Sequence, residues 1–187
     1  MNIDQFYHIC RASVAIANVD YIFVYGSNAI LPWLEDQQTS IDTIIGKEML
    51  SIELDISVRD DDNDKLNTIV DATIGELSLF HDTHSVYPHP NTPTKLFMAP
   101  MSWSNRMKID DQETYKIIVP HYSDLIFSKM MAGREKDLVF CVKMSKFFKL
   151  SFDTLNILKN EYIKENSKQK EVTNLNFNKF QSRLRTF

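Results

Sequence analysis

The spacing of apolar and polar residues divides the first part of the chain into alternating helices and strands. Between residues 3 and 17, apolar side chains recur at helical spacing, which predicts an amphipathic helix. The next run, 21–25, is almost wholly apolar, as expected for a strand covered on both faces. Gly26 and Ser27 follow this strand, and we expect them to open a short, irregular helix that reaches Trp33.

Strict alternation over residues 51–58 predicts a half-buried strand. The apolar positions are Ile52, Leu54, Ile56 and Val58, and the polar ones are Ser51, Glu53, Asp55 and Ser57. The acid-rich run 60–64 comes next and suits the start of a helix over 64–74, because acids are favoured at the positive end of the helix dipole.

The middle of the chain is less regular, and the end is helical. The pattern predicts strands at 80–87, 95–97, 106–109 and 115–119, the last two forming a hairpin. It predicts helices at 124–132, 134–149 and 152–165, with a polar, partly loose segment at 166–187. We therefore expect an α/β (α+β) fold with a mixed sheet. Residues 1–120 form its core, and residues 121–187 form a C-terminal helical part in the same compact unit.

Composition narrows the class of protein without naming a function. The 187 residues are 43% hydrophobic and 25% charged, which is typical of a globular protein. The net charge of −4 gives no general attraction to nucleic acid, so a polyanion site must be local. Cys10 and Cys141 lie in apolar helical patterns and fit buried free thiols of a reducing compartment. With neither an apolar run of 18 residues nor a basic leader, we expect a cytoplasmic protein without membrane contact.

Glu53 and Asp55 are candidate metal ligands. Residues i and i+2 of a strand point the same way, about 7 Å apart at Cα, and paired carboxylates suit Mg²⁺ or Mn²⁺. The alternative is an exposed strand face that merely carries acids.

Gly26 and Ser27 are candidate phosphate-binding residues. A strand that turns into a helix at Gly-Ser presents backbone N–H groups and a hydroxyl, and glycine lets a phosphate approach closely. An ordinary turn in which Ser27 caps the helix is the alternative.

The segment 128–137 gathers charge of both signs around Gly133. Lys129, Gly133 and Asp137 are four residues apart and share a face if one helix continues through the glycine. Lys129 and Arg134 are suited to grip a triphosphate, and Asp137 to orient them or to join a metal site. A solvated helix corner with internal salt bridges explains the same residues.

Histidines at 81, 84 and 89 suggest a further possibility. Together His81, His84 and His89 make a zinc-dependent hydrolase conceivable, although no cysteine accompanies them and their spacing fits no standard zinc pattern. The alternative is a loop rich in hydrogen-bonding side chains.

The order of these motifs resembles a known family. The segments Val24–Ser27, Ser51–Asp55, Ile74–His84 and Asp124–Asp137 are similar to bacterial nucleotidyltransferase-like proteins of unassigned function. These are related to the abortive-infection (AbiEii-type) toxins of toxin–antitoxin systems. The resemblance runs from about residue 20 to residue 145, and Ser128-Lys129 followed by Ala132-Gly133-Arg134-Glu135-Lys136-Asp137 is its most specific part.

The resemblance implies a DNA polymerase β-like nucleotidyltransferase fold and assigns roles by position. Gly26 and Ser27 would bind nucleotide phosphates, Glu53 and Asp55 would bind Mg²⁺, and Lys129 and Asp137 would complete the site. The chain departs from the pattern by having Glu53 where aspartate is more usual, and by the 25 residues between Ser27 and Glu53. It also shows no evident third acid.

Two function classes follow from these observations. The first is a metal-dependent nucleotidyltransferase that moves a nucleoside monophosphate from an NTP to a protein hydroxyl or an RNA 3′ end, as a component of a toxin–antitoxin pair. The second is a weak or inactive relative that serves as a binding or regulatory module. Asp71 and Glu76 are the nearest candidates for a third acid.

Overall fold

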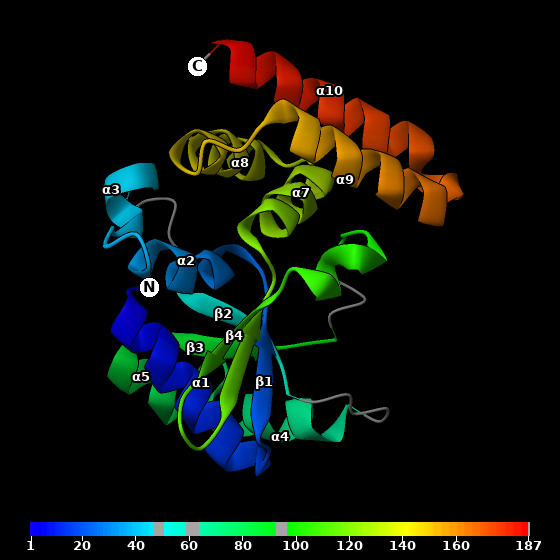
Figure 1. The fold of residues 1–187 in the computed structure, drawn as a ribbon. Helices are drawn as coiled ribbons and strands as arrows, with labels where there is room; N and C mark the ends of the chain where they lie inside the picture. The colour runs from blue at the N-terminus through cyan, green and yellow to red at the C-terminus, as the bar shows by residue number, and fades with distance from the viewer. Residues whose placement is uncertain (47–50, 59–63, 93–96, 187) are drawn as a thin grey trace.

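A computed structural model of the chain describes residues 1–46, 51–58, 64–92 and 97–186. The described residues form a five-stranded sheet with helices around it and a stack of helices beyond one end (Figure 1). The strands are β1 (Tyr21–Val24), β2 (Glu53–Ser57), β3 (Tyr87–Pro90), β4 (Lys108–Asp111) and β5 (Lys116–Val119). The expected α/β architecture with a mixed sheet is confirmed.

The sheet has the strand order β3-β2-β1-β5-β4. β1 pairs antiparallel with β2 and parallel with β5, while β2 pairs parallel with β3 and β4 pairs antiparallel with β5. The β2–β3 register sets Glu53 opposite Tyr87 and Asp55 opposite His89. This register brings side chains far apart in sequence onto one polar face.

The helices separate into an N-terminal and a C-terminal group. The first comprises α1 (Ile3–Ala17), the 3-10 helix η1 (Ser27–Ile30), α2 (Leu31–Glu35), α3 (Ile41–Ile45), α4 (Lys65–Ile74) and α5 (Leu79–His84). The second comprises η3 (Met101–Asn105), α7 (Tyr122–Ala132), α8 (Glu135–Phe147), α9 (Phe152–Glu165), η4 (Ser167–Gln169) and α10 (Lys170–Thr186). Helices α7 to α10 stack together, with α9 and α10 farthest from the sheet (Figure 1). Across the described ranges, no helix combines the length and apolar character that crossing a membrane requires.

Local capping fixes the bounds of α1. The Asn2 side chain accepts from the Gln5 backbone N–H at 2.8 Å, and the Gln5 side chain accepts from the Asn2 N–H at 3.0 Å. This capping box satisfies two donors at the helix start. Asn18 ends the helix in the left-handed conformation, which asparagine adopts readily.

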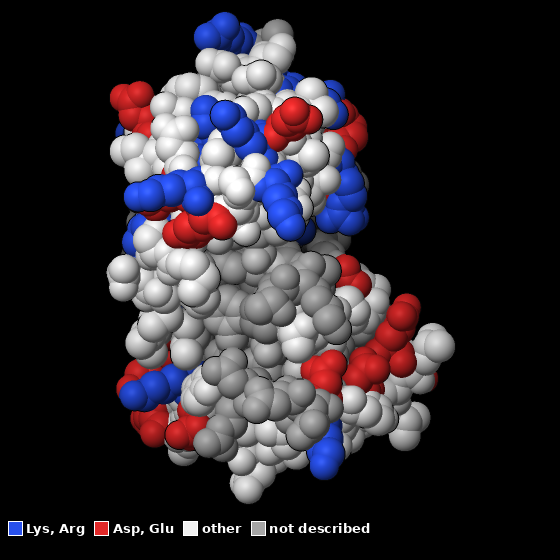
Figure 2. Space-filling model, turned by 90° about the vertical axis from the view of Figure 1, so that its right-hand side faces the viewer, with Lys and Arg blue, Asp and Glu red and all other residues white. Residues whose placement is uncertain are grey.

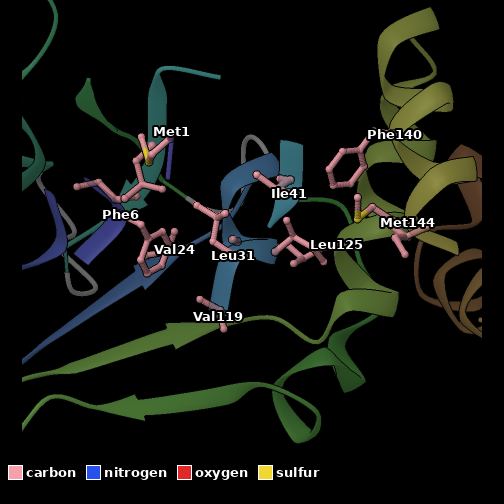
Figure 3. Close-up of a cluster of buried hydrophobic side chains, with 14 of the residues drawn as sticks. Met1, Phe6, Val24, Leu31, Ile41, Val119, Leu125, Phe140 and Met144 are labelled. Carbon is pink, nitrogen blue, oxygen red and sulfur yellow. The ribbon is translucent and has the colours of Figure 1, made fainter. Parts of the chain in front are cut away.

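One apolar core joins the sheet to the C-terminal helices. It extends from Met1 and Phe6 near the N-terminus to Phe140 and Met144 on α8, with Leu125 of α7 between them (Figure 3). Because both parts contribute to the same core, the helices beyond residue 120 are packed onto the α/β part rather than tethered to it.

The predicted strand at 80–87 is wrong, because most of this segment is helix α5. Ser78 begins the helix, its hydroxyl accepting from the His81 N–H at 3.1 Å, and Ser85 ends it in the left-handed conformation. Only Tyr87 belongs to a strand, β3. The strand predicted at 95–97 falls mostly outside the described residues, as does the acidic run 60–63, and Phe97 itself lies in irregular backbone.

The segment expected to be partly loose forms η4 and the long helix α10. Its sequence is polar, but Phe177 and Phe180 are buried, at 3% and 0% exposure. Tertiary burial of these few apolar side chains explains the order of a helix whose local sequence signal is weak.

Removing one of these anchors should destabilise the whole protein. Phe180→Ala is expected to lower the free energy of unfolding by about 3–5 kcal/mol, because it leaves a cavity in the core. Leu175→Ala, on the same helix but 54% exposed, should cost less than about 1 kcal/mol. Urea denaturation measures both. Equal, small losses in the two variants would contradict the packing of α10 described here.

Candidate functional site

A cavity of about 670 Å³ lies between the sheet and the helices α7 and α8. Its walls come from the turn after β1, from β2 and β3, and from α7, α8 and the turn that joins these helices. The candidate nucleotide-binding and metal-binding residues of the nucleotidyltransferase hypothesis all line it: Gly26, Ser27, Glu53, Asp55, Lys129, Arg134 and Asp137. Segments more than a hundred residues apart are therefore brought to one place.

The turn after β1 requires glycine at position 26. Gly26 has φ 76°, and a Cβ atom there would lie 2.0 Å from Oδ2 of Asp55. Asn28 holds the turn against β2, its side-chain amide donating to the backbone carbonyl of Glu53 at 2.8 Å. Ser27 is the first residue of η1, with Gly26 in the cap position. The turn thus places backbone and hydroxyl groups beside the acidic strand.

The acidic wall of the cavity is built by β2 and β3. Glu53 accepts a long hydrogen bond of 3.5 Å from the Tyr87 hydroxyl, and Asp55 Oδ1 lies 3.2 Å from Nδ1 of His89. Burial raises the pKa of Asp55 above its ordinary value, and the charge of Glu53 adds to the shift. His89 and Lys129 oppose it by favouring the ionised carboxylate.

The basic wall comes from the ends of two helices, not from one continuous helix. Gly133 ends α7 in the left-handed conformation, at φ 66°, and Arg134 is the N-cap of α8. The break expected at Gly133 is therefore present, and the shared face that one continuous helix would give Lys129 and Asp137 does not form. The two side chains still meet, with Nζ to Oδ1 at 3.6 Å, because α7 and α8 fold back on each other.

Asp137 forms ion pairs with both cations of this wall. Arg134 donates through Nε to Oδ2 at 2.5 Å, and Lys129 lies on the other carboxylate oxygen. The Asp137 side chain is 4% exposed, whereas that of Arg134 is 59% exposed. The hydrogen bond to Asp137 raises the pKa of Arg134. Asp137 thus orients the two cations and has little surface left for a ligand.

The surface charge is divided between the sheet and the C-terminal helices, as are the acidic and basic walls of the cavity. On the face shown in Figure 2, Lys and Arg are concentrated on the upper half, at the height of the C-terminal helices in Figure 1. Acidic side chains are more frequent on the lower half. The positive charge of this face therefore lies with the helices, although the whole chain is negative.

The proposed zinc cluster of histidines does not form. His81 and His84 lie on α5, while His89 lies on β3 beside Asp55. His84 instead contacts His8 of α1, with the two Nε2 atoms 3.4 Å apart. Arg11 donates to Nδ1 of His8 at 3.2 Å, so the ring proton of neutral His8 sits on Nε2 and points to His84.

His89 is the cavity residue whose position the sequence did not reveal. It stands beside Asp55 because β3 pairs with β2, a contact between residues 34 apart. Ser128 and Lys136 also line the cavity. Asp71 and Glu76, considered as third acids, do not line it, and both are exposed on or after α4.

The donor set fits a magnesium ion that is completed by substrate. Among the residues that the structure describes, no three His, Cys, Asp or Glu side chains form a group able to hold a metal by themselves. Mg²⁺ is usually bound by one or two carboxylates, with phosphate oxygens and water filling its shell. Glu53 and Asp55 on one strand, facing two cations suited to phosphate, are consistent with that kind of site.

Comparisons with protein-family models, curated proteins and solved structures find no match to this chain. The geometry of the cavity and the motif resemblance are therefore the support for a function.

The half-buried carboxylate of Asp55 should reduce stability when no cation is bound. Its folded-state pKa is raised above the ordinary 3.8, so the folded protein holds this proton more tightly than the unfolded chain. Stability is then lost as the pH rises through the interval between the two values. With a chelator present, Asp55→Asn should melt at or above the wild-type temperature at pH 7.5, and this advantage should shrink toward pH 4.

Asp111→Asn, at an exposed position of β4, is the control and should leave the melting temperature nearly unchanged. A clear loss of stability in Asp55→Asn at pH 7.5 would mean that the charge is stabilised in the folded protein, contrary to this description.

Proposed function

We propose that the protein is a metal-dependent nucleotidyltransferase, which moves a nucleoside monophosphate from an NTP to a protein hydroxyl or an RNA 3′ end. One observation carries this proposal. A single cavity brings two carboxylates of one strand, Glu53 and Asp55, together with the cations Lys129 and Arg134, and the turn at Gly26 lies against Asp55. Nucleotidyl transfer needs this combination, because a cation and a polyphosphate must be held together.

Each group has a role in binding the nucleotide. Lys129 and Arg134, oriented by Asp137, bind the outer phosphates, and Ser27 with its neighbouring backbone contributes further donors to phosphate. Glu53 and Asp55 would hold the divalent cation, Mg²⁺ or Mn²⁺. When bound, that ion neutralises charge on the phosphates and fixes their geometry.

The proposed reaction is a displacement at phosphorus. The acceptor hydroxyl oxygen attacks the α-phosphorus and loses its proton to water. The bond between the α-phosphorus and the bridging oxygen breaks, and pyrophosphate leaves. Lys129 and Arg134 stabilise the charge that develops on the leaving group, in a partly buried site where electrostatic contacts are stronger than in water.

The second candidate is a binding or regulatory module with this fold, acting with a partner such as an antitoxin. A specific observation favours it: His89, and not a third carboxylate, stands beside Asp55 on the neighbouring strand. A site with two acids has fewer ligands for a second ion than a site with three. The toxin–antitoxin role and the cytoplasmic location remain expectations that the resemblance and the composition support.

Nucleotide binding separates both candidates from an unrelated function. Mg²⁺-ATP or Mg²⁺-CTP at 100 times its dissociation constant should add about 2.7 kcal/mol to stability. That gain corresponds to a rise of roughly 5–10 °C in melting temperature for a chain of this size. The rise should vanish in Lys129→Ala and persist in Lys146→Ala, an exposed lysine of α8 outside the cavity. If no nucleotide shifts the wild-type melting temperature at millimolar concentration, the proposal is wrong.

Incorporation of labelled nucleotide separates the enzyme from the module. With all four labelled NTPs, Mg²⁺ or Mn²⁺, and cell lysate as the acceptor pool, wild type should label protein or RNA. Asp55→Asn should abolish labelling, because a carboxylate that would hold the metal is lost while the fold is kept. Glu53→Asp should lower but not abolish it, since the shorter side chain still offers a carboxylate.

Labelling that Asp55→Asn leaves unchanged would come from another site or a contaminant. Nucleotide binding without labelling under any metal would favour the regulatory module.

A further inference from the structure

The side chain of Asn176, on α10, closes the end of α7. It is 7% exposed, and its Nδ2 donates to the backbone carbonyl of Met131 at 2.9 Å. The last carbonyls of a helix have no partner within that helix, so a side chain from elsewhere must satisfy those that are buried. Asn176 supplies this partner from a residue 45 positions further along the chain.

The same amide also packs against the turn between α7 and α8. A Cβ atom on Gly133 would lie 2.9 Å from Oδ1 of Asn176 and 3.0 Å from its Nδ2. Glycine is therefore favoured at position 133 for two reasons. The backbone there is left-handed, and the Asn176 amide occupies the space that a Cβ atom would need. Arg134 is the next residue, and Asp137 lies in the first turn of α8.

Two further features hold α10 in place. Arg183 forms an ion pair with Glu135, which is also in the first turn of α8. Phe177, next to Asn176, is buried in the core. The packing of α10 therefore fixes the position of the Asn176 amide. The amide in turn fixes the position of the turn at Gly133, against which it packs.

We propose that Asn176 is a positioning residue for the phosphate-binding cations. By fixing the end of α7 and the turn that follows, it sets the distance between Lys129 on one helix and Arg134 at the start of the next. This inference rests on the proposed function. It assigns part of the protein's affinity for its substrate to α10, a helix that does not line the cavity. A cation misplaced by about 1 Å loses much of its contribution to binding and catalysis.

The chemistry of the amide makes the assignment specific. Asn176 must donate to a carbonyl, which an aspartate of the same shape cannot do when ionised. Asn176→Asp would place a negative charge beside that carbonyl, and Asn176→Ala would leave the carbonyl without its partner. Both variants should loosen the turn, although only the first adds repulsion.

Tripolyphosphate with Mg²⁺ is a probe for this contact that does not depend on the base. We expect Asn176→Ala to bind it at least about tenfold more weakly than wild type in calorimetry, and Asn176→Asp to bind it more weakly still. In turnover assays, the KM for NTP should rise by a similar factor, with a smaller change in kcat. The measurements are made at a temperature where each variant is folded.

Thr173→Val is the matched control. Thr173 is also buried on α10, but its hydroxyl donates to the Gln169 carbonyl at the end of the preceding η4, at 2.8 Å. This variant loses a buried hydrogen bond without touching the turn, so it should keep wild-type tripolyphosphate affinity. Equal affinity in wild type, Asn176→Ala and Thr173→Val would overturn the proposal. So would a parallel loss in both variants, which would indicate a general effect of α10 stability.

A second measurement tests the contact without any ligand. Gly133→Ala should cost less stability in the Asn176→Ala background than in wild type, because the clash is relieved while the backbone strain remains. Additive costs would contradict the contact. If the wild-type protein binds no triphosphate, both the proposed function and this inference are wrong. A wild type that binds, with Asn176→Ala unaffected, overturns the inference alone.

Discussion

The basic half of the cavity depends on the buried carboxylate of Asp137. A carboxylate removed from water needs cations and donors around it, and here it has Lys129 from α7 and Arg134 from the start of α8. The same contact that satisfies Asp137 holds two positive side chains beside each other, where they would otherwise repel. Burial of one negative group thus makes a doubly positive wall stable, and leaves Arg134 exposed enough to meet an anion.

The acidic half depends on backbone geometry instead. Gly26 approaches β2 so closely that the Asp55 carboxylate occupies the space of a missing side chain. The strand order then adds β3 on the far side, which sets His89 against Asp55. The two halves come from different parts of the chain, and the shared core keeps them facing each other. A change in the core beneath either half would therefore be expected to alter the width of the cavity, even if no residue that lines the cavity is replaced.

The sequence predicted those features that depend on local periodicity. Glu53 and Asp55 could be placed on one face because alternation over 51–58 is a local property of a strand. The break between two helices at Gly133 was also predicted, but the contact between Lys129 and Asp137 across that break comes from tertiary folding. The pairing of Asp55 with His89 joins distant segments, and no local pattern encodes it. α10 was missed because its order comes from burial of a few side chains, not from its composition.

The dependence of the Gly133 turn on Asn176 has a consequence for how the protein is made. The ribosome synthesises Asn176 39 residues after Asp137, which corresponds to roughly two to eight seconds of translation. During that interval the sheet, the acidic strand and both cations exist in the nascent chain, but the contact that fixes the end of α7 does not. A chain still attached to the ribosome at this stage would hold the basic wall of the cavity in a loosened form. The order of synthesis would then delay the final geometry of this wall until α10 has been made and has folded onto α7 and α8.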